Sequence, residues 1–142
     1  MSLKRISPQE ALELTRDGWI YLDVRTTEEF EGGHPEGAFN VPLAVMAGGS
    51  MTPNPDFVPV VERAFGKDAK LVVGCKAGGR SLRAAQALLD AGFTNIVDQR
   101  AGWDGARDPF GQLSEPGWSR AGLPATQQAA VGHSYAEIKA KG

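Results

Sequence analysis

The sequence predicts an α/β domain with a central, mainly parallel sheet of about five strands and helices on both faces. Short runs of β-favouring residues alternate with helical segments along the chain, and strands joined in this way by helices are parallel. One of these runs, residues 71–74, is apolar without alternation, as expected of a strand buried on both faces. The length of 142 residues, 42% of them hydrophobic, suits one domain with a proper core.

The first part of the chain is expected to hold two helices and two strands. Residues 7–10 (Ser-Pro-Gln-Glu) have the form of a capping box that begins a helix, and Gly18 ends that helix. Residues 19–22 follow as a short buried strand. A second capping box at 26–29 begins a very short helix that the next two glycines stop, and 38–41 form another strand.

The second part continues the alternation after a loop at residues 45–53, which is rich in Gly, Met and Pro. A helix is expected over 54–65, because its apolar residues fall on one face and a glycine follows it. The buried strand 71–74 comes next, then a helix over 81–91 and a last strand over 95–98. These elements complete the predicted sheet.

The order becomes weaker after Trp103. Residues 104–120 contain Gly, Pro and Trp without a period and are expected to be an insertion in a single domain that spans residues 1–125. A tail over 126–142 follows, with a terminal helix expected over 126–141.

Composition excludes several classes of function. The 15 basic and 17 acidic residues leave a net charge of −2, which argues against a nucleic-acid-binding protein. No apolar run reaches the roughly 18 residues of a membrane span, and no lipidation motif is present. The opening residues lack the apolar core of a signal peptide, so a cytoplasmic protein is expected. The single cysteine excludes an internal disulfide and a multi-cysteine zinc site.

One stretch carries most of the chemical information. The buried strand 71–74 delivers Cys75 into a glycine-containing loop from which a helix begins at once, at the end of the sheet where α/β proteins bind ligands. Gly78 and Gly79 allow the positive φ values with which loop N–H groups curl inward, and the helix adds its positive end. Lys76 and Arg80 add positive charge. Each feature stabilises a thiolate, so we expect Cys75 to be a nucleophile rather than a structural cysteine.

Three chemistries could use such a loop. The first is sulfur transfer through a persulfide on the cysteine. The second is phosphate or arsenate chemistry on a Cys-x5-Arg loop, but only four residues separate Cys75 from Arg80, and the tighter cradle suits one large sulfur better. The third is a nucleotide P-loop, since residues 74–81 imitate its pattern and Asp98 resembles a metal-binding aspartate, although Arg80 stands where that motif has a lysine.

Four ordered segments carry a family resemblance: residues 21–30 (Tyr-Leu-Asp-Val-Arg-Thr-Thr-Glu-Glu-Phe), 33–42 (Gly-His-Pro-Glu-Gly-Ala-Phe-Asn-Val-Pro), 75–81 and 102–103 (Gly-Trp). The chain resembles the single-domain rhodaneses, which are thiosulfate-type sulfurtransferases, from about residue 6 to 103 and again at 121–124. It is most similar to the plant senescence-associated and bacterial single-domain branch. The resemblance implies a rhodanese-like fold.

The resemblance also implies a mechanism. The Cys75 thiolate would attack the outer sulfur of thiosulfate, expel sulfite and keep a persulfide, from which cyanide or a thiol takes the sulfur. The backbone amides of the loop would stabilise that persulfide and bind the donor. The loop residues concerned are Lys76, Ala77, Gly78, Gly79, Arg80 and Ser81. No organic cofactor and no metal is implied.

Charged side chains near the loop have expected roles of their own. Arg80 either binds the thiosulfate anion or forms a salt bridge with Asp23 or a nearby acid, and Lys76 tunes the charge at the mouth of the loop. Arg25 and Glu29 stand four apart and, by the resemblance, form a structural pair that holds the first strand to the second helix. Asp23, Arg25 and Glu29 are therefore expected to support the site.

The expected partners are small molecules: a sulfur donor such as thiosulfate, and cyanide or a thiol as acceptor. Because the chain has one cysteine, an acceptor thiol must come from outside it, and a thiol-bearing protein is one possibility. Neither nucleic acid nor a membrane is expected, and the chain is expected to be a monomer or a weak homodimer. The competing interpretation is a persulfide carrier or sulfur-sensing module that does not turn over, and a phosphatase or arsenate reductase ranks third.

Overall fold

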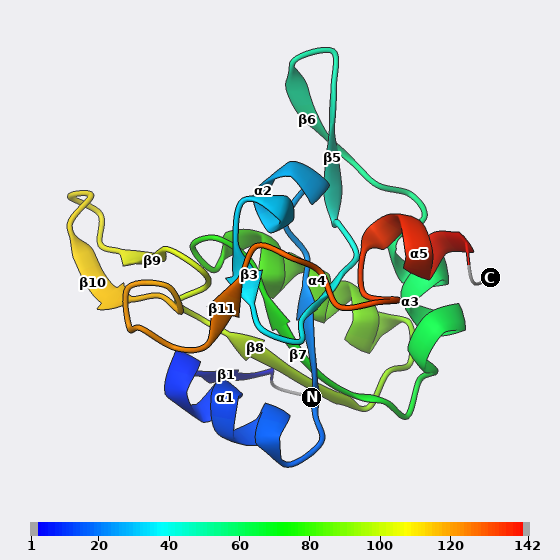
Figure 1. The fold of residues 1–142 in the computed structure, drawn as a ribbon, viewed down its shortest axis with the longest axis horizontal. Helices are drawn as coiled ribbons and strands as arrows, with labels where there is room; N and C mark the ends of the chain where they lie inside the picture. The colour runs from blue at the N-terminus through cyan, green and yellow to red at the C-terminus, as the bar shows by residue number, and fades with distance from the viewer. Residues whose placement is uncertain (1–2, 141–142) are drawn as a thin grey trace.

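The computed structural model describes residues 3–140 and is organised around one five-stranded sheet, drawn in Figure 1. All its neighbouring strands run parallel, as the sequence predicted. Their order across the sheet is β1 (Lys4–Ile6), β8 (Asn95–Gln99), β7 (Lys70–Gly74), β2 (Ile20–Asp23) and β4 (Phe39–Asn40).

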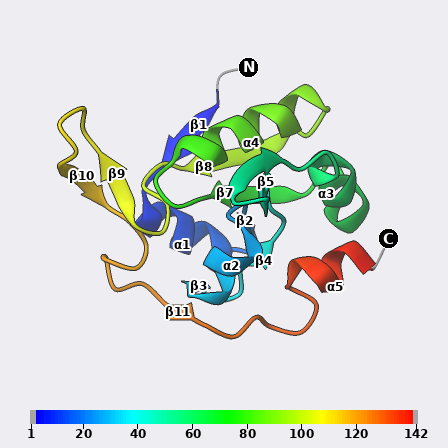
Figure 2. The ribbon, with the colours of Figure 1, turned by 90° about the horizontal axis from the view of Figure 1, so that it is seen from above.

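Helices cover both faces of this sheet, which Figure 2 shows edge-on, and this prediction is also confirmed. One face is covered by α1 (Pro8–Arg16) and α2 (Thr27–Glu31). The other is covered by α3 (Phe57–Phe65), α4 (Gly79–Asp90) and α5 (Tyr135–Ala140).

The two faces bury separate apolar clusters because successive side chains of a strand point to opposite sides of the sheet. Leu22 and Val73 pack toward α3 and α4, whereas Tyr21 and Val72 pack toward α1 and α2. All four side chains are buried, and each apolar one stabilises the fold by about 2 kcal/mol. The central strands β2 and β7 are therefore held rigidly, and the loops that follow them begin from fixed positions.

Both predicted capping boxes are present. Ser7 accepts a hydrogen bond from the backbone of Glu10, whose carboxylate accepts one from Ser7 N–H in return. Thr26 and Glu29 make the same exchange at the start of α2. Since these bonds satisfy N–H groups that a helix leaves open, they determine where both helices begin.

Strand β1 was not foreseen in the sequence. Its residues Lys4 and Arg5 are exposed and charged, because β1 lies at an edge of the sheet, and only Ile6 is buried. A three-residue edge strand with two charged residues lacks the hydrophobic pattern by which a strand is predicted from sequence. It nevertheless completes the five-stranded sheet, as the edge strand that pairs with β8.

The expected loop at 45–53 is wrong, because the chain there forms an antiparallel hairpin of β5 (Ala44–Ala47) and β6 (Ser50–Pro53). Gly48 and Gly49 make its two-residue turn with φ values of 59° and 81°. Two positive φ values are what a hairpin turn with the right twist requires, so the Gly-Gly pair was a hairpin signal. Figure 1 shows this hairpin rising clear of the body of the molecule.

The expected insertion also has regular structure. Its strands β9 (Gly105–Arg107) and β10 (Leu113–Pro116) form a second antiparallel ribbon, which projects at the left of the domain in Figure 1.

The terminal helix expected over 126–141 is much shorter in the structure. Strand β11 (Ala125–Thr126) instead pairs with β3 (His34–Pro35), and the helix α5 covers only 135–140, with residue 141 outside the described residues. Gly132 has a φ of 84°, which a helix does not allow, and the Ser134 hydroxyl accepts a hydrogen bond from the N–H of Glu137 at the start of α5. Ile138 of α5 is buried in the core, so this end of the chain packs onto the domain.

Two further helix boundaries differ from expectation. The helix expected from 54 begins at Phe57, because Asn54 instead accepts the N–H of Asp56 in a turn. The helix expected from 81 begins two residues earlier, at Gly79. This places Arg80 and Ser81 in the first turn of α4.

Candidate active site

The predicted site residues meet at the carboxyl ends of the parallel strands. Asp23 ends β2, and Cys75 directly follows the neighbouring strand β7. Glu29 belongs to α2, which follows β2, and Arg80 and Ser81 belong to the first turn of α4. Lys76, Ala77 and Gly79 are exposed in the loop, whereas Gly78 and Ser81 are buried.

Cys75 is held in the curve of its own loop. Its Sγ accepts a hydrogen bond from the N–H of Gly78 at 3.1 Å, and the residue is 2% exposed. Gly78 has a φ of 100°, and a Cβ there would collide with the carbonyl oxygen of Arg100. Only glycine can therefore turn the loop back onto the sulfur at this position. The positive φ expected at Gly79 is wrong, because Gly79 is the first residue of α4.

The backbone carbonyls of Cys75 and Lys76 accept hydrogen bonds from the chain segment that follows β8. Trp103 N–H donates to the carbonyl of Cys75 at 2.7 Å, and Asp104 N–H donates to that of Lys76 at 2.9 Å. Gly102 allows this approach, since a Cβ there would meet the backbone of Cys75 and Lys76. These two carbonyls therefore already have hydrogen-bond donors from the segment after β8.

Several loop amides, in contrast, have no hydrogen-bond acceptor among residues 3–140. Three of them belong to the first turn of α4, where a helix leaves its N–H groups open. These N–H groups and the positive end of the helix form a set of donors suited to an anion or a thiolate. The amides concerned are those of Lys76, Ala77, Gly79, Arg80 and Ser81.

Arg80 forms a salt bridge, and its partner is Glu29. Its Nη1 and Nη2 donate to the two carboxylate oxygens at 2.6 and 2.9 Å. Partial burial on its own would raise the pKa of Glu29, but the hydrogen bonds from Arg80 and Thr26 outweigh it and lower that pKa to about 2. Arg80 was expected either to bind the thiosulfate anion or to form a salt bridge. The structure shows the salt bridge, which joins α4 to α2.

The expected pairing of Arg25 with Glu29 is wrong, because Arg25 pairs with Asp23 instead. Nη2 of Arg25 lies 2.7 Å from the Asp23 carboxylate and 2.6 Å from the carbonyl of Gly33, and both charged side chains are buried. Burial would lower the pKa of Arg25, but the neighbouring Asp23 carboxylate outweighs it and raises that pKa. The guanidinium also lies 5.1 Å from the ring centre of Trp103, an interaction of the cation–π type.

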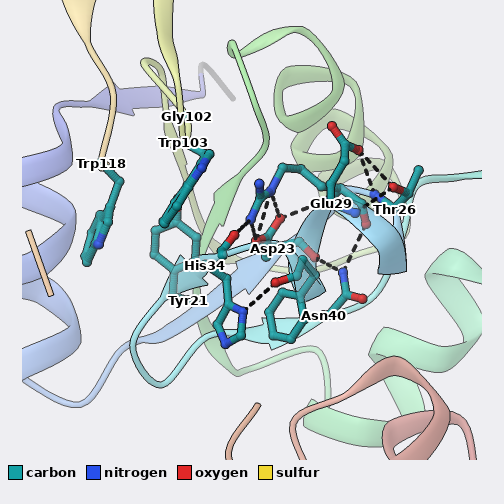
Figure 3. A network of polar contacts seen from close by, with 12 residues as sticks. Tyr21, Asp23, Thr26, Glu29, His34, Asn40, Gly102, Trp103 and Trp118 are labelled. Atoms are coloured by element: carbon teal, nitrogen blue, oxygen red, sulfur yellow. Dashed lines mark hydrogen bonds and ion pairs between the residues drawn. The ribbon is translucent and has the colours of Figure 1, made fainter. Parts of the chain in front are cut away.

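Asp23 is the centre of a wider buried network, which Figure 3 shows. Asn40 Nδ2 donates to the backbone carbonyls of Asp23 and Arg25, at 3.0 Å each. His34 is a hydrogen-bonded turn residue, as expected, with Nδ1 2.7 Å from the carbonyl of Phe30. This network ties α2, β2 and the end of β4 together beside the Cys75 loop.

Two residues that support the loop were missed. Arg5 of β1 lies beside Asp98 of β8, and its Nε donates to the Asp98 carboxylate at 2.6 Å while Nη2 donates to the carbonyl of Gly78 at 3.2 Å. Burial raises the pKa of Asp98, and Arg5 opposes that rise. Asp98, which resembles a metal-binding aspartate in the sequence, instead forms an ion pair with Arg5 and so positions Arg5 to bond the carbonyl of Gly78 in the loop.

Two features are absent from residues 3–140, the part of the chain that the structure describes. No helix in that range is long and apolar enough to cross a membrane. No group of three or more His, Cys, Asp and Glu side chains there is arranged around a metal ion.

The comparisons with known proteins agree with one another. Residues 7–108 match the profile of the rhodanese-like domain. The chain is 40% identical over 119 residues to thiosulfate sulfurtransferase 16, chloroplastic, of Arabidopsis thaliana, a match that covers 84% of this chain and 89% of that protein. It is 44% identical over 93 residues to the senescence-associated protein DIN1 of Raphanus sativus, covering 66% of this chain and 51% of DIN1. Among solved structures, Rv0390 from M. tuberculosis superimposes with a TM-score of 0.75 at 26% identity, over 90% of this chain and all of that one.

Proposed function

This chain belongs to the rhodanese family, as its four sequence motifs predicted, and we propose that it is a sulfurtransferase that works through a persulfide on Cys75. The donor in this proposal is thiosulfate or a similar sulfane-sulfur compound, and the acceptor is cyanide or a thiol. One observation carries the proposal: the only cysteine of the chain has its Sγ 3.1 Å from the Gly78 amide, in a loop whose other amides are unpaired among residues 3–140.

The first half-reaction forms the persulfide. The Cys75 thiolate attacks the outer sulfur of thiosulfate, a new S–S bond forms, and the old S–S bond breaks as sulfite leaves with its electron pair. The amides of Lys76, Ala77 and Gly79 are available to receive the negative charge of the bound sulfur, since none has another acceptor in the described chain. Because Cys75 is only 2% exposed, a small donor fits this step better than a bulky one.

The second half-reaction regenerates the enzyme. Cyanide or a thiolate attacks the outer sulfur of the persulfide, and the Cys75 thiolate is the leaving group, so no oxidant or reductant is consumed. The chain contains one cysteine, and an acceptor thiol therefore belongs to another molecule.

The charged residues divide into two groups in this proposal. Arg80 is engaged by Glu29 through both nitrogens, so we assign it the role of holding α4 against α2 rather than that of the principal anion ligand. Lys76 is exposed on the loop and is the residue that attracts a dianionic donor. Asp23 and Arg25 support the loop through the buried network.

The test is intact mass of the protein before and after thiosulfate, with sulfite measured in the same tube and Cys75→Ser as control. A gain of about 32 Da in the wild type only, removed by cyanide with sulfite released in each cycle, supports the turnover enzyme. Mass gain without repeated sulfite release would instead identify a persulfide carrier. The absence of both a mass gain and sulfite release would contradict the proposal. Arsenate reduction would then be measured next.

Location and assembly remain predictions. The expected cytoplasmic location contrasts with the Arabidopsis relative, whose name places it in the chloroplast. Action as a monomer or weak homodimer can be measured by sedimentation of the purified chain.

A further inference from the structure

The β5–β6 hairpin is the least charged part of this chain. From Gly37 to Pro55 there is no Asp, Glu, Lys or Arg, although 23% of the whole chain is charged. The hairpin nevertheless projects from the domain, with Met46 and Met51 almost half exposed. Projecting strands are usually protected by charged side chains, so an uncharged one with exposed methionines suggests a binding surface.

The hairpin stands at the same end of the sheet as Cys75. The chain enters it directly from the carboxyl end of β4, and Leu43 N–H donates to the carbonyl of Val24, just beyond the carboxyl end of β2, at 3.1 Å. Leu43 also packs on the apolar cluster that contains the Cys75 side chain. Ligands of parallel α/β sheets bind at this end.

A cavity of about 480 Å³ lies between the hairpin and α4. Its volume is within the range of small-molecule sites, and most of its walls are apolar. The lining residues are Leu43, Ala44, Met51, Pro53, Asn54 and Arg83. The Asn54 side chain already serves the fold, because its Nδ2 donates to Pro42 and Tyr135 and its Oδ1 accepts from Asp56.

Arg83 is the one charged residue of this lining. Within residues 3–140 it forms no ion pair, whereas Arg80, one helical turn earlier, is fully engaged by Glu29. An unpaired guanidinium at an apolar cavity matches a ligand with an apolar body and one acidic group. Arg83 stands four residues after Gly79, about 6 Å along the helix axis, so the cavity is offset from the Cys75 loop by one turn.

We propose that this cavity is the acceptor subsite, and that it binds a thiol whose several-carbon apolar chain ends in a carboxylate held by Arg83. The inference rests on the proposed sulfurtransferase function. With the acid at Arg83 and the apolar chain against Leu43 and Met51, the ligand's thiol extends toward the loop. Its thiolate attacks the outer sulfur of the Cys75 persulfide, an S–S bond forms to the ligand, and the Cys75 thiolate leaves.

The test compares two acceptors of equal length, mercaptohexanoate and mercaptohexanol, which differ only in the acidic group. With thiosulfate as donor, we expect kcat/KM from sulfite release to be about tenfold higher for the acid, the effect of one charge-assisted contact. Arg83→Gln should remove this preference. Arg63→Gln, at another exposed arginine without an ion pair among residues 3–140, should retain it.

A second pair of variants tests the apolar wall. Met46 and Met51 face each other across the hairpin and are 47% and 46% exposed, but only Met51 lines the cavity. Met51→Ser should raise the KM for mercaptohexanoate several-fold, and Met46→Ser should leave it as in the wild type. Equal rates with acid and alcohol in the wild type, or equal effects of the paired variants, would overturn the inference.

The two proposals fail separately. Cyanide turnover by the wild type reports the sulfurtransferase alone. Hexanoate, which has no thiol, reports the site alone, through the shift of the Met51 methyl signal in NMR. If thiosulfate releases no sulfite, the hexanoate titration still decides: a saturable Met51 shift that Arg83→Gln abolishes supports the carboxylate site, and no shift refutes it.

Discussion

Arg80 and Glu29 join the first turn of α4 to α2 through two hydrogen bonds of 2.6 and 2.9 Å between opposite charges. The helix that carries the amides of the Cys75 loop is thereby attached to the helix that follows β2. Such bidentate pairs are directional as well as strong, so they hold orientation and not only distance.

The first prediction concerns the acid stability that Glu29 provides. Its pKa is lowered from 4.5 to about 2 in the folded protein. A carboxylate of this kind contributes stability that is complete above its unfolded pKa and is lost as the pH falls from about 4.5 through about 2. Because the side chain is partly exposed, we expect Glu29→Gln to lower the free energy of unfolding by about 2 kcal/mol at pH 7.

Urea unfolding between pH 7 and pH 2 measures this effect. The difference between wild type and Glu29→Gln should shrink toward zero at the acid end, whereas Glu31→Gln, at an exposed position of the same helix, should change little at any pH. A difference that stays constant down to pH 2 would exclude an ionised Glu29 as its source.

A second prediction concerns the buried pair of Arg25 and Asp23. Both side chains are at most 3% exposed, and Arg25 also bonds the carbonyl of Gly33. Removing one partner leaves a buried charge without compensation, which costs about 3–5 kcal/mol. Arg25→Met should therefore lower the thermal unfolding midpoint strongly, while Arg16→Met, on the exposed end of α1, should leave it almost unchanged. Similar midpoints for the two variants would refute the buried-pair account.

The third prediction separates two adjacent glycines of the loop. Gly78 has a φ of 100° and its missing Cβ faces the carbonyl of Arg100, whereas a Cβ at Gly79 would meet nothing within 4 Å. Gly78→Ala should therefore displace the amide that bonds Cys75 Sγ and reduce persulfide formation more than tenfold, on the order of one lost donor to a charged sulfur. Gly79→Ala should retain most of the activity.

Persulfide formation can be followed by mass in both variants, with circular dichroism to verify folding. Equal activity of Gly78→Ala and wild type would show that the Gly78 contact does not stabilise the reacting sulfur.

A fourth prediction tests the support under the loop. Asp98 is fully buried, and Arg5 is its ion-pair partner. Arg5→Met leaves that carboxylate buried alone and should destabilise the fold by about 3 kcal/mol, and adding Asp98→Asn should recover a large part of the loss. A double-mutant cycle of urea unfolding measures the coupling. Strictly additive effects would mean that the two side chains do not interact.

Much of this protein could be read from local patterns. The run 71–74 was predicted as a strand because apolar residues without alternation, placed between two helices, are typical of a strand buried on both faces. The loop at Cys75 was predicted as the functional segment because a strand, a cysteine, glycines and a helix start follow one another directly. Both properties depend on residues close together in sequence, so no tertiary information was needed.

The partners of the charged side chains depended on the tertiary structure. The family resemblance suggested that Arg25 pairs with Glu29, yet Glu29 bonds Arg80, 51 residues away, and Arg25 bonds Asp23. Arg5 meets Asp98 across 93 residues only because β1 adds to the sheet beside β8 in one register. Many acids and bases of a chain have compatible charge, and the one that a given arginine meets is decided by which backbones the sheet and helices bring within hydrogen-bond distance.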